Sequence, residues 1–340
     1  MNTMIPLDRN ESYWLLDEEL LAVCKEYDVR TLSTYPQYGQ LKQALADYAG
    51  IDSSFLALTP GSDAAIQEFA RAYVGEGGAA LLPVPTFYGY ESILERVGAR
   101  VIPVTYTEED GRYLFPIDET CRLLETERPK VLFLCNPNNP LGSPIPDEDL
   151  ERLRKATATS GTMFVVDEAY YEYSGRTLIQ RFADTPNLVI FRTLSKGFGI
   201  SGARVGYCVA HPDVIRALEK LMLPWPIAHT SVAAALALLG RVPAVTARRE
   251  QTIAARDAFK SSLEARAKCT VYPSETNFLL VRVADATSAA SALRSEGIAV
   301  ATGDWMSRVP EAKKLLDSTL RIATPAPEDA ERVVDILSNL

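Results

Sequence analysis

From about Gln40 to Pro224 the sequence alternates short, continuous apolar runs with segments that have helical spacing. Runs of Val, Ile, Leu, Phe and Ala predict strands buried on both faces, because a strand with one exposed face alternates apolar and polar residues instead. The predicted strands are Ala79–Leu82, Val101–Val104, Val131–Cys135, Met163–Val166, Leu188–Phe191 and Val205–Ala210. Helices are predicted to begin between or after these strands, near Ser62, Phe87, Pro146 and Pro212. This order predicts an α/β fold with a mostly parallel, doubly wound sheet.

The pattern changes after Trp225-Pro226. An Ala- and Leu-rich helical stretch covers about 230 to 268, and short strands follow near Phe278–Val283 and Thr319–Ile322 with helices beside them. A chain of 340 residues is long enough for two domains. We therefore expect an N-terminal segment, 1–35, that packs with a small α/β domain, 229–340, and a large domain, 36–228, between them.

Charge, cysteine spacing and hydropathy narrow the choice of partners and compartment. The formal net charge is -9 and the basic residues are spread along the chain, which argues against nucleic acid or an anionic membrane as a partner. Cys24, Cys121, Cys135, Cys208 and Cys269 have no paired or metal-ligand spacing, so we expect reduced thiols in a cytoplasmic protein. The start of the chain has no signal-peptide pattern, and no apolar run has the length of a membrane span. No metal site is expected, because the only histidines, at positions 211 and 229, are not accompanied by other residues at metal-ligand spacing.

Polar clusters follow three of the predicted strands, at 135–142, 167–173 and 193–200. Open parallel sheets bind ligands at the carboxyl ends of their strands. Lys196 lies in the third cluster, directly after a buried strand and among small residues, where a solvated surface charge is a poor explanation. A lysine held there is better explained as an amine that forms a Schiff base with a carbonyl cofactor such as pyridoxal 5'-phosphate (PLP).

The other clusters contain side chains that such a cofactor needs. Asp167 could keep a pyridine nitrogen protonated, and Tyr170 could reach the phenolic oxygen of the ring. Ser62 is a candidate N-cap of a helix whose N-terminus could bind a phosphate, and the aromatic residues at 87–90 could stack on a ring. Ser195 and Arg204 could both contact a phosphate, and Arg321 could orient a substrate carboxylate. Taken one at a time, these residues also fit plain structural roles, as a helix start, core aromatics or exposed strand residues.

Together these residues resemble the fold-type I PLP enzymes of the class I/II aminotransferase superfamily, and the histidinol-phosphate aminotransferase branch in particular. The resemblance covers nearly the whole chain, and its motifs occur in the family order. They are Asn10-Glu11, Tyr35-Pro36, Gly61-Ser62-Asp63, Pro85-Thr86-Phe87, Asn138-Asn139-Pro140-Leu141-Gly142, Asp167-Glu168-Ala169-Tyr170, Thr193-Leu194-Ser195-Lys196, Gly202-Ala203-Arg204-Val205-Gly206-Tyr207, Ser274-Glu275-Thr276-Asn277-Phe278 and Leu320-Arg321-Ile322.

The resemblance implies a catalytic set of Lys196, Asp167 and Tyr170. Lys196 would carry the cofactor and move the substrate proton. The implied cofactor-binding residues are Ser62, Asp63, Phe87, Asn139, Asp167, Tyr170, Ser195, Lys196 and Arg204, together with Tyr35 from the partner subunit of a homodimer. The implied substrate-binding residues are Arg321, Asn10 and Tyr13. Ala64, Leu141 and the residues after Asn10-Glu11 depart from the commoner family pattern, and these departures concern the substrate more than the cofactor.

We therefore expect a transfer of amino groups between an amino acid, or an amino acid-derived phosphate, and a 2-oxo acid. Two alternatives remain open at this stage. The same scaffold supports PLP-dependent decarboxylases, cyclases and oxidases, which motif residues alone do not separate from aminotransferases. The other alternative is a catalytically silent, aminotransferase-like binding protein.

Overall fold

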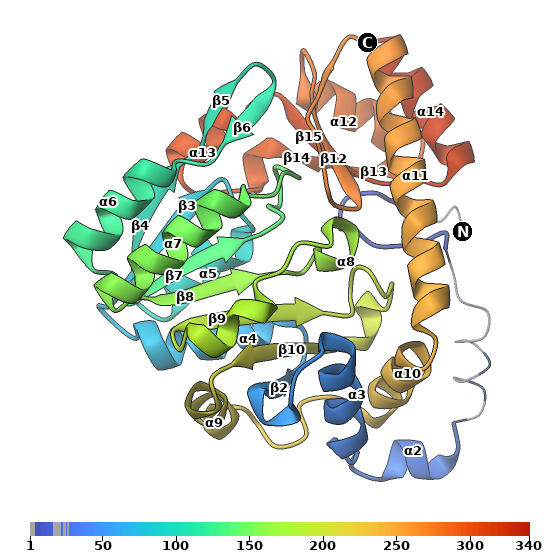
Figure 1. The fold of residues 1–340 in the computed structure, drawn as a ribbon. Helices are drawn as coiled ribbons and strands as arrows, with labels where there is room; N and C mark the ends of the chain where they lie inside the picture. Colours follow the sequence, from blue (N-terminus) through green and yellow to red (C-terminus); the bar gives the residue numbers. More distant parts are fainter. Residues whose placement is uncertain (1–3, 16–21, 23–24, 26) are drawn as a thin grey trace.

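The computed structural model describes residues 4–15, 22, 25 and 27–340, so Cys24 and part of the expected 1–35 segment lie outside the described residues. Its centre is a seven-stranded sheet with the order β2-β10-β9-β8-β7-β3-β4 (Figure 1). The strands are β2 (Leu56–Thr59), β3 (Ala79–Val84), β4 (Arg100–Thr105), β7 (Val131–Cys135), β8 (Met163–Asp167), β9 (Leu188–Thr193) and β10 (Gly206–Ala210). Only β10 runs against its neighbours, so the prediction of a mostly parallel sheet is confirmed.

Each predicted strand is present to within two residues, and β2 is a strand that the sequence pattern did not suggest. Successive residues of β7 explain why the runs are continuously apolar. Leu132 and Leu134 belong to one hydrophobic cluster, whereas Val131 and Phe133 belong to another. Because side chains alternate between the faces of a strand, both faces of this sheet are buried.

Helices cover both faces of the central sheet, as a doubly wound arrangement requires. One cluster includes side chains of α3 (Gly39–Ala49), α6 (Ile117–Glu127) and α7 (Asp147–Ser160). The other includes side chains of α4 (Ser62–Phe69), α5 (Tyr88–Arg96) and α9 (Pro212–Leu221). The short α8 (Tyr171–Ser174) follows β8 directly. Turns of 3-10 or π helix are η1 (Ser53–Phe55), η2 (Ala70–Val74), η3 (Ile179–Asp184) and η4 (Ser201–Ala203).

A second, four-stranded antiparallel sheet has the order β11-β12-β15-β14. Its strands are β11 (Thr270–Val271), β12 (Phe278–Arg282), β14 (Ala301–Thr302) and β15 (Thr319–Ala323). The predicted helical stretch is two helices, α10 (His229–Leu239) and the long α11 (Val242–Arg266), which climbs along one side of the molecule (Figure 1). The remaining elements here are α12 (Ala286–Ser295), η5 (Gly303–Trp305), α13 (Pro310–Leu315) and α14 (Pro327–Ser338).

Two further pairings join distant parts of the chain. Near the N-terminus, β1 (Ile5–Pro6) pairs in parallel with β13 (Ile298–Ala299), and the backbone of Leu7 is hydrogen bonded to Ala299 and Ala323. The hairpin of β5 (Thr107–Glu109) and β6 (Arg112–Leu114) meets the second sheet through an ion pair between Glu108 and Arg282. The helix α2 (Val29–Ser33) packs on α10.

In the described part of the chain, no helix by itself has the length and apolarity of a membrane span. The consecutive helices α10 and α11 meet both criteria only when joined across an 84° bend.

Candidate active site

A cavity of about 490 Å³ lies at the carboxyl ends of β7, β8 and β9. Most of the site residues expected from the sequence line it. These are Asn10, Ser62, Asp63, Phe87, Asn139, Asp167, Tyr170, Ser195, Lys196, Arg204 and Arg321. The strand order explains the convergence, because the ends of adjacent parallel strands meet at one edge of the sheet.

Lys196 lines this cavity, three residues after the end of β9. Its Nζ donates hydrogen bonds to the backbone carbonyls of Arg9 (3.0 Å) and Asn10 (3.2 Å). Burial lowers the pKa of Lys196 to about 8, and the positive charge of Arg321 adds to the effect. An amine with this pKa is partly uncharged near neutral pH, which is the form that attacks a carbonyl group or accepts a proton.

Asp167 is the last residue of β8 and is buried. Its Oδ2 accepts a hydrogen bond from the hydroxyl of Tyr90 (3.0 Å), and its Oδ1 accepts one from the backbone N–H of Ala169 (3.0 Å). Burial raises the pKa of Asp167 to about 7, although both hydrogen bonds act in the opposite direction. A carboxylate in this state has no cationic partner in the described part of the protein, and a protonated ring nitrogen would supply one.

Tyr90 was missed by the sequence reasoning, which considered only stacking for the aromatic cluster at 87–90. The available signal was helical spacing. Phe87 and Tyr90 are three residues apart at the start of α5, so they share a face of the helix. Phe87 lines the cavity, and its ring packs edge-on against the ring of Tyr90, with centroids 5.9 Å apart.

One end of the cavity is suited to an anion. The prediction that Ser62 caps α4 is wrong, because Gly61 is the N-cap residue and Ser62 is the first helical residue. Gly61 has a φ of +83°, a backbone conformation that favours glycine, and an added Cβ would lie 2.6 Å from Nη2 of the flexible Arg204 side chain. The free N–H groups of the first turn of α4 therefore lie close to a guanidinium group, a combination that attracts anions.

Two more polar side chains belong to this end. Ser195 accepts a hydrogen bond from the hydroxyl of Thr193 (2.8 Å) and lies 3.5 Å from Nη1 of Arg204. Asp63 forms an ion pair of 3.4 Å with Nη2 of Arg204, and both side chains are about half exposed. Such an exposed pair is weak, so an incoming dianion can displace it.

Asn139 and Arg321 line the cavity and are joined by a hydrogen bond. Arg321 lies in β15, and its Nη1 donates to Oδ1 of Asn139 (2.7 Å) while its Nη2 donates to the backbone carbonyl of Asp8 (2.5 Å). Its Nε is buried without a hydrogen-bond partner in the described residues. Burial lowers the pKa of Arg321 from its usual range. A buried guanidinium that is only partly satisfied is a strong site for a carboxylate.

Four consecutive residues of the N-terminal segment, 8–11, line the cavity, and we call them its roof. Asn10 has a φ of +56°, and its Nδ2 donates to the hydroxyl of Tyr170 (2.9 Å). Burial raises the pKa of Tyr170. Tyr13, the other predicted substrate residue from this segment, does not line the cavity. Its hydroxyl donates to Asp329 (2.6 Å) and accepts from the backbone N–H of Ala326 (3.0 Å), which fixes the segment to α14.

Tyr35 also lies away from the cavity within one chain. Its side chain is 69% exposed, and its ring stacks on Trp225 with a centroid distance of 4.2 Å. A tyrosine at position 35 could therefore contact this cavity only if it came from a second copy of the chain.

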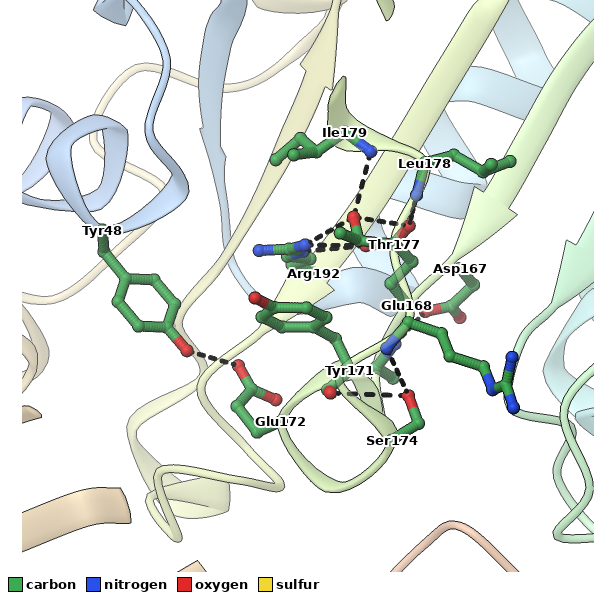
Figure 2. A network of polar contacts seen from close by, with 12 residues as sticks. Tyr48, Asp167, Glu168, Tyr171, Glu172, Ser174, Thr177, Leu178, Ile179 and Arg192 are labelled. Carbon is green, nitrogen blue, oxygen red and sulfur yellow. Dashed lines mark hydrogen bonds and ion pairs between the residues drawn. The ribbon is translucent and has the colours of Figure 1, made fainter. Parts of the chain in front are cut away.

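Behind the cavity, a buried ion pair holds the turn that carries Asp167 and Tyr170 (Figure 2). Glu168 accepts from Nε of Arg192 (3.0 Å) and from the backbone N–H of Leu178 (2.8 Å). The guanidinium of Arg192 also lies over the ring of Tyr171, 3.6 Å from its centroid. The sequence reasoning missed this pair, since neither residue lines the cavity and they are 24 positions apart.

The family model described as aminotransferase class I and II matches residues 2–337. A histidinol-phosphate aminotransferase of Thermoanaerobacter pseudethanolicus is 33% identical over 337 residues, which cover 98% of this chain and 92% of that protein.

Solved structures show a similar fold. The histidinol-phosphate aminotransferase of Sinorhizobium meliloti, solved in complex with pyridoxal-5'-phosphate, matches with a TM-score of 0.85 and 24% identity, covering 99% of this chain and 91% of that chain. The L-threonine-O-3-phosphate decarboxylase of Porphyromonas gingivalis matches with a TM-score of 0.82 and 23% identity, covering 99% of each chain. At these identities the structural likeness shows the fold alone.

Proposed function

This chain belongs to the class I and II aminotransferase family of PLP-dependent enzymes, and we propose that its site moves an amino group between an amino acid, or an amino acid-derived phosphate, and a 2-oxo acid. The observation that carries the proposal is the convergence of Lys196 and Arg321 on one cavity. An amine with a pKa of about 8 and a partly unsatisfied guanidinium would there face the reacting carbon and the carboxylate of the same substrate.

The residues present fit the cofactor. When bound, PLP supplies an aldehyde for covalent attachment of amino groups and a pyridine ring that withdraws electrons. Ser62, Asp63, Ser195 and Arg204 would hold its phosphate at the anion-binding end, where glycine at position 61 leaves room for the guanidinium. Asp167 would pair with the ring nitrogen, and Phe87 would cover a face of the ring.

Asn139 and Tyr170 would hold the phenolic oxygen of the ring, since both line the cavity beside Lys196. Arg321 would bind the substrate carboxylate in place of the carbonyl of Asp8. Lys196, freed from the carbonyls of Arg9 and Asn10, would take the α-proton of the substrate and return it to the carbon that carried the cofactor's aldehyde, two bonds from the α-carbon. The N-terminal roof would exclude water while it does so.

A test of this function uses the purified protein loaded with PLP. An amino donor should convert the cofactor to its amine form, seen as a change in visible absorbance, and a 2-oxo acid should reverse the change. Lys196→Ala should lose at least about a hundredfold in this rate, the range expected for general acid–base catalysis. Release of carbon dioxide or consumption of oxygen without the amine form would support a decarboxylase or an oxidase instead. A protein that binds PLP but converts no donor would support a silent binding protein.

We also propose a cytoplasmic homodimer in which Tyr35 reaches the cofactor phosphate of the partner subunit. Supporting this, Leu32 and Leu223 are more than three-quarters exposed beside Tyr35 and Trp225, on α2 and on the segment before α10. A group of exposed large apolar side chains is typical of a protein–protein interface.

A further inference from the structure

The backbone of Lys196 is held by a tyrosine that does not line the cavity. The hydroxyl of Tyr173 donates a hydrogen bond to the carbonyl oxygen of Lys196 (3.2 Å). The same oxygen accepts a second hydrogen bond from the backbone N–H of Gly199 (3.0 Å), within the turn of residues 196–199 that we call the lysine turn. Burial raises the pKa of Tyr173, so its hydroxyl keeps its proton and remains a donor. Both acceptor positions of the lysine carbonyl are therefore filled.

Tyr173 is itself fixed in place. Its side chain is buried and belongs to a small apolar cluster with Ala169, Tyr170 and Phe278. Its backbone N–H donates to the carbonyl of Tyr170 (3.0 Å), which directly precedes α8 and lines the cavity. The helix α8 is thus a short spacer, with a residue proposed for the cofactor ring at one end and a bond to the backbone of Lys196 at the other.

The neighbouring residue of α8, Glu172, also contacts the lysine turn. A Cβ added to Gly197 would lie only 2.4 Å from the Cβ of Glu172, so α8 and the lysine turn are in direct contact. The buried carboxylate of Glu172 accepts a hydrogen bond from the hydroxyl of Tyr48 (3.5 Å; Figure 2). The ring of Tyr48 in turn packs edge-on against Phe198, with centroids 5.2 Å apart. The lysine turn therefore has little room to move on the side of α8.

The bond from Tyr173 differs from the other polar contacts of Lys196 in one respect. Nζ of Lys196 is bonded to the carbonyls of Arg9 and Asn10, and these bonds are given up when the amine attacks a carbonyl group. The bond from Tyr173 involves only the backbone, so it persists while the amine changes partners. A displacement of about 1 Å in a reacting group can cost about a hundredfold in rate, so a contact of this kind matters for the reaction.

We propose that Tyr173 is a positioning residue, whose hydroxyl holds the backbone of Lys196 at a fixed place relative to Tyr170 and so directs the amine into the cavity. This proposal rests on the aminotransferase function proposed above. It adds to that function a residue that the motif set does not contain and that does not line the cavity.

The first test measures the reactivity of Lys196 in the cofactor-free protein. Acetic anhydride is applied over a range of pH, and mass spectrometry follows acetylation of the peptide that contains Lys196. In the wild-type protein the rate should be half-maximal near pH 8, the pKa of this amine. In Tyr173→Phe the looser backbone gives Nζ more access to water, so this midpoint should rise by at least about half a pH unit towards the ordinary lysine value.

The second test separates the covalent attachment of PLP from its binding. PLP added to cofactor-free Tyr173→Phe should attach about 3- to 10-fold more slowly than to the wild-type protein at neutral pH, the effect of losing one hydrogen bond. The analogue 4'-deoxypyridoxine 5'-phosphate lacks the aldehyde. It should bind both proteins with nearly equal affinity in calorimetry, because Tyr173 does not line the cavity.

Tyr113→Phe is the matched control for both tests and should behave as the wild-type protein. It removes a hydroxyl from a buried tyrosine that donates to the backbone carbonyl of Leu315 (3.0 Å), away from the cavity. A wild-type midpoint or a wild-type attachment rate in Tyr173→Phe would overturn the proposal. A loss of analogue binding as large as the loss of attachment rate would also overturn it, because the whole site would then be loosened. Neither test uses an amino donor, so failure of every donor to produce the amine form of the cofactor would overturn the proposed function alone.

Discussion

Arg321 in the four-stranded sheet is hydrogen bonded to Asn139 in the segment after β7 of the seven-stranded sheet, with Nη1 of the arginine 2.7 Å from Oδ1 of the asparagine. The residue proposed for the substrate carboxylate thus touches a residue proposed for the cofactor ring. Binding at one position therefore affects the orientation of the other.

Replacement of Asn139 should weaken substrate binding, and a negatively charged replacement should weaken it more than a neutral one. Asn139→Ala removes an acceptor from a charged donor, which is worth about 1.5–3 kcal/mol, so KM for an amino acid donor should rise roughly 10- to 100-fold. Asn139→Asp should raise KM further, because its carboxylate would compete with that of the substrate for Arg321. Steady-state kinetics would check this order of KM values. Asn339→Ala serves as the control, because Asn339 is an exposed asparagine at the far end of the chain. An aspartate variant that binds donors better than the alanine variant would contradict it.

The low pKa of Lys196 predicts selective reactivity in the cofactor-free protein. Because burial and Arg321 lower this pKa to about 8, the uncharged amine should predominate above pH 8, well below the usual lysine value of about 10.4. Acylation of the Lys196 peptide, followed by mass spectrometry, should reach half of its maximal rate near pH 8. The exposed Lys314 on α13 provides an internal reference. Equal pH dependence of the two peptides would show that the site does not tune this amine.

Asp167→Asn should stabilise the cofactor-free protein while abolishing most activity. The pKa of Asp167 is about 7 in the folded state, above the ordinary value of 3.8, so the folded state binds more protons between these values and loses stability as pH rises through them. The loss is complete above about pH 7 and absent below pH 3.8. At about 1.4 kcal/mol per pH unit, the full loss of stability is on the order of 4 to 5 kcal/mol.

Thermal unfolding of the cofactor-free Asp167→Asn variant at pH 5 and pH 8 would check this sign. Its advantage over the wild-type protein should be larger at pH 8. The exposed Asp317→Asn should show no such pH-dependent gain. An Asp167→Asn variant that is less stable than wild type at pH 8 would mean that the carboxylate is favourably held even without the cofactor.

Removing only one partner of the buried ion pair between Glu168 and Arg192 should strongly destabilise the protein. Arg192→Met leaves a buried, unpaired carboxylate and should lower the free energy of unfolding by about 3–5 kcal/mol, measured by urea denaturation. The double variant Glu168→Leu/Arg192→Met should recover more than half of this loss. Arg216→Met removes an exposed ion pair with Asp213 and should change stability by less than about 1 kcal/mol. Additive losses in the double variant would rule out the pairing explanation.

The proposed dimer interface predicts separate effects for its apolar and hydroxyl groups. Leu223→Asp should shift the protein towards monomer in sedimentation and weaken PLP binding, because a monomer lacks the tyrosine of its partner. Tyr35→Phe should weaken PLP binding without changing the sedimentation coefficient. Leu114→Asp introduces a charge on a different exposed surface and should do neither. An active, fully PLP-loaded monomer would remove the proposed role of Tyr35.

The sequence was a good guide where burial is continuous along the chain. Strands such as β7 are apolar at every position because both faces are covered, so their ends, and the polar clusters beyond them, could be located from the pattern alone. The pattern therefore predicted that Lys196, Asp167 and Asn139 lie at one edge of the sheet, where they line one cavity.

Contacts between segments far apart in the chain could not be located in this way. Trp305 contacts Tyr88, and Ser307 donates a hydrogen bond to Glu91, each across more than 200 positions. A single sequence does not show that residues so far apart along the chain lie close together. The N-cap of α4 was predicted one residue too late, because serine is a common N-cap, whereas the N-cap residue here has a φ of +83°, which favours glycine. Short pairings such as β1 with β13 have too few residues for a periodic signal.

The pairing of Leu7 with Ala299 and Ala323 has a consequence for synthesis of the chain on the ribosome. The carbonyls that accept from Lys196 belong to a segment synthesised before the lysine, yet that segment can pair with Ala299 and Ala323 only after those residues have been added. A nascent chain can therefore form its central sheet early without assembling the roof of the pocket. Prematurely terminated products that stop before Ala323 would leave this lysine uncovered and catalytically incomplete.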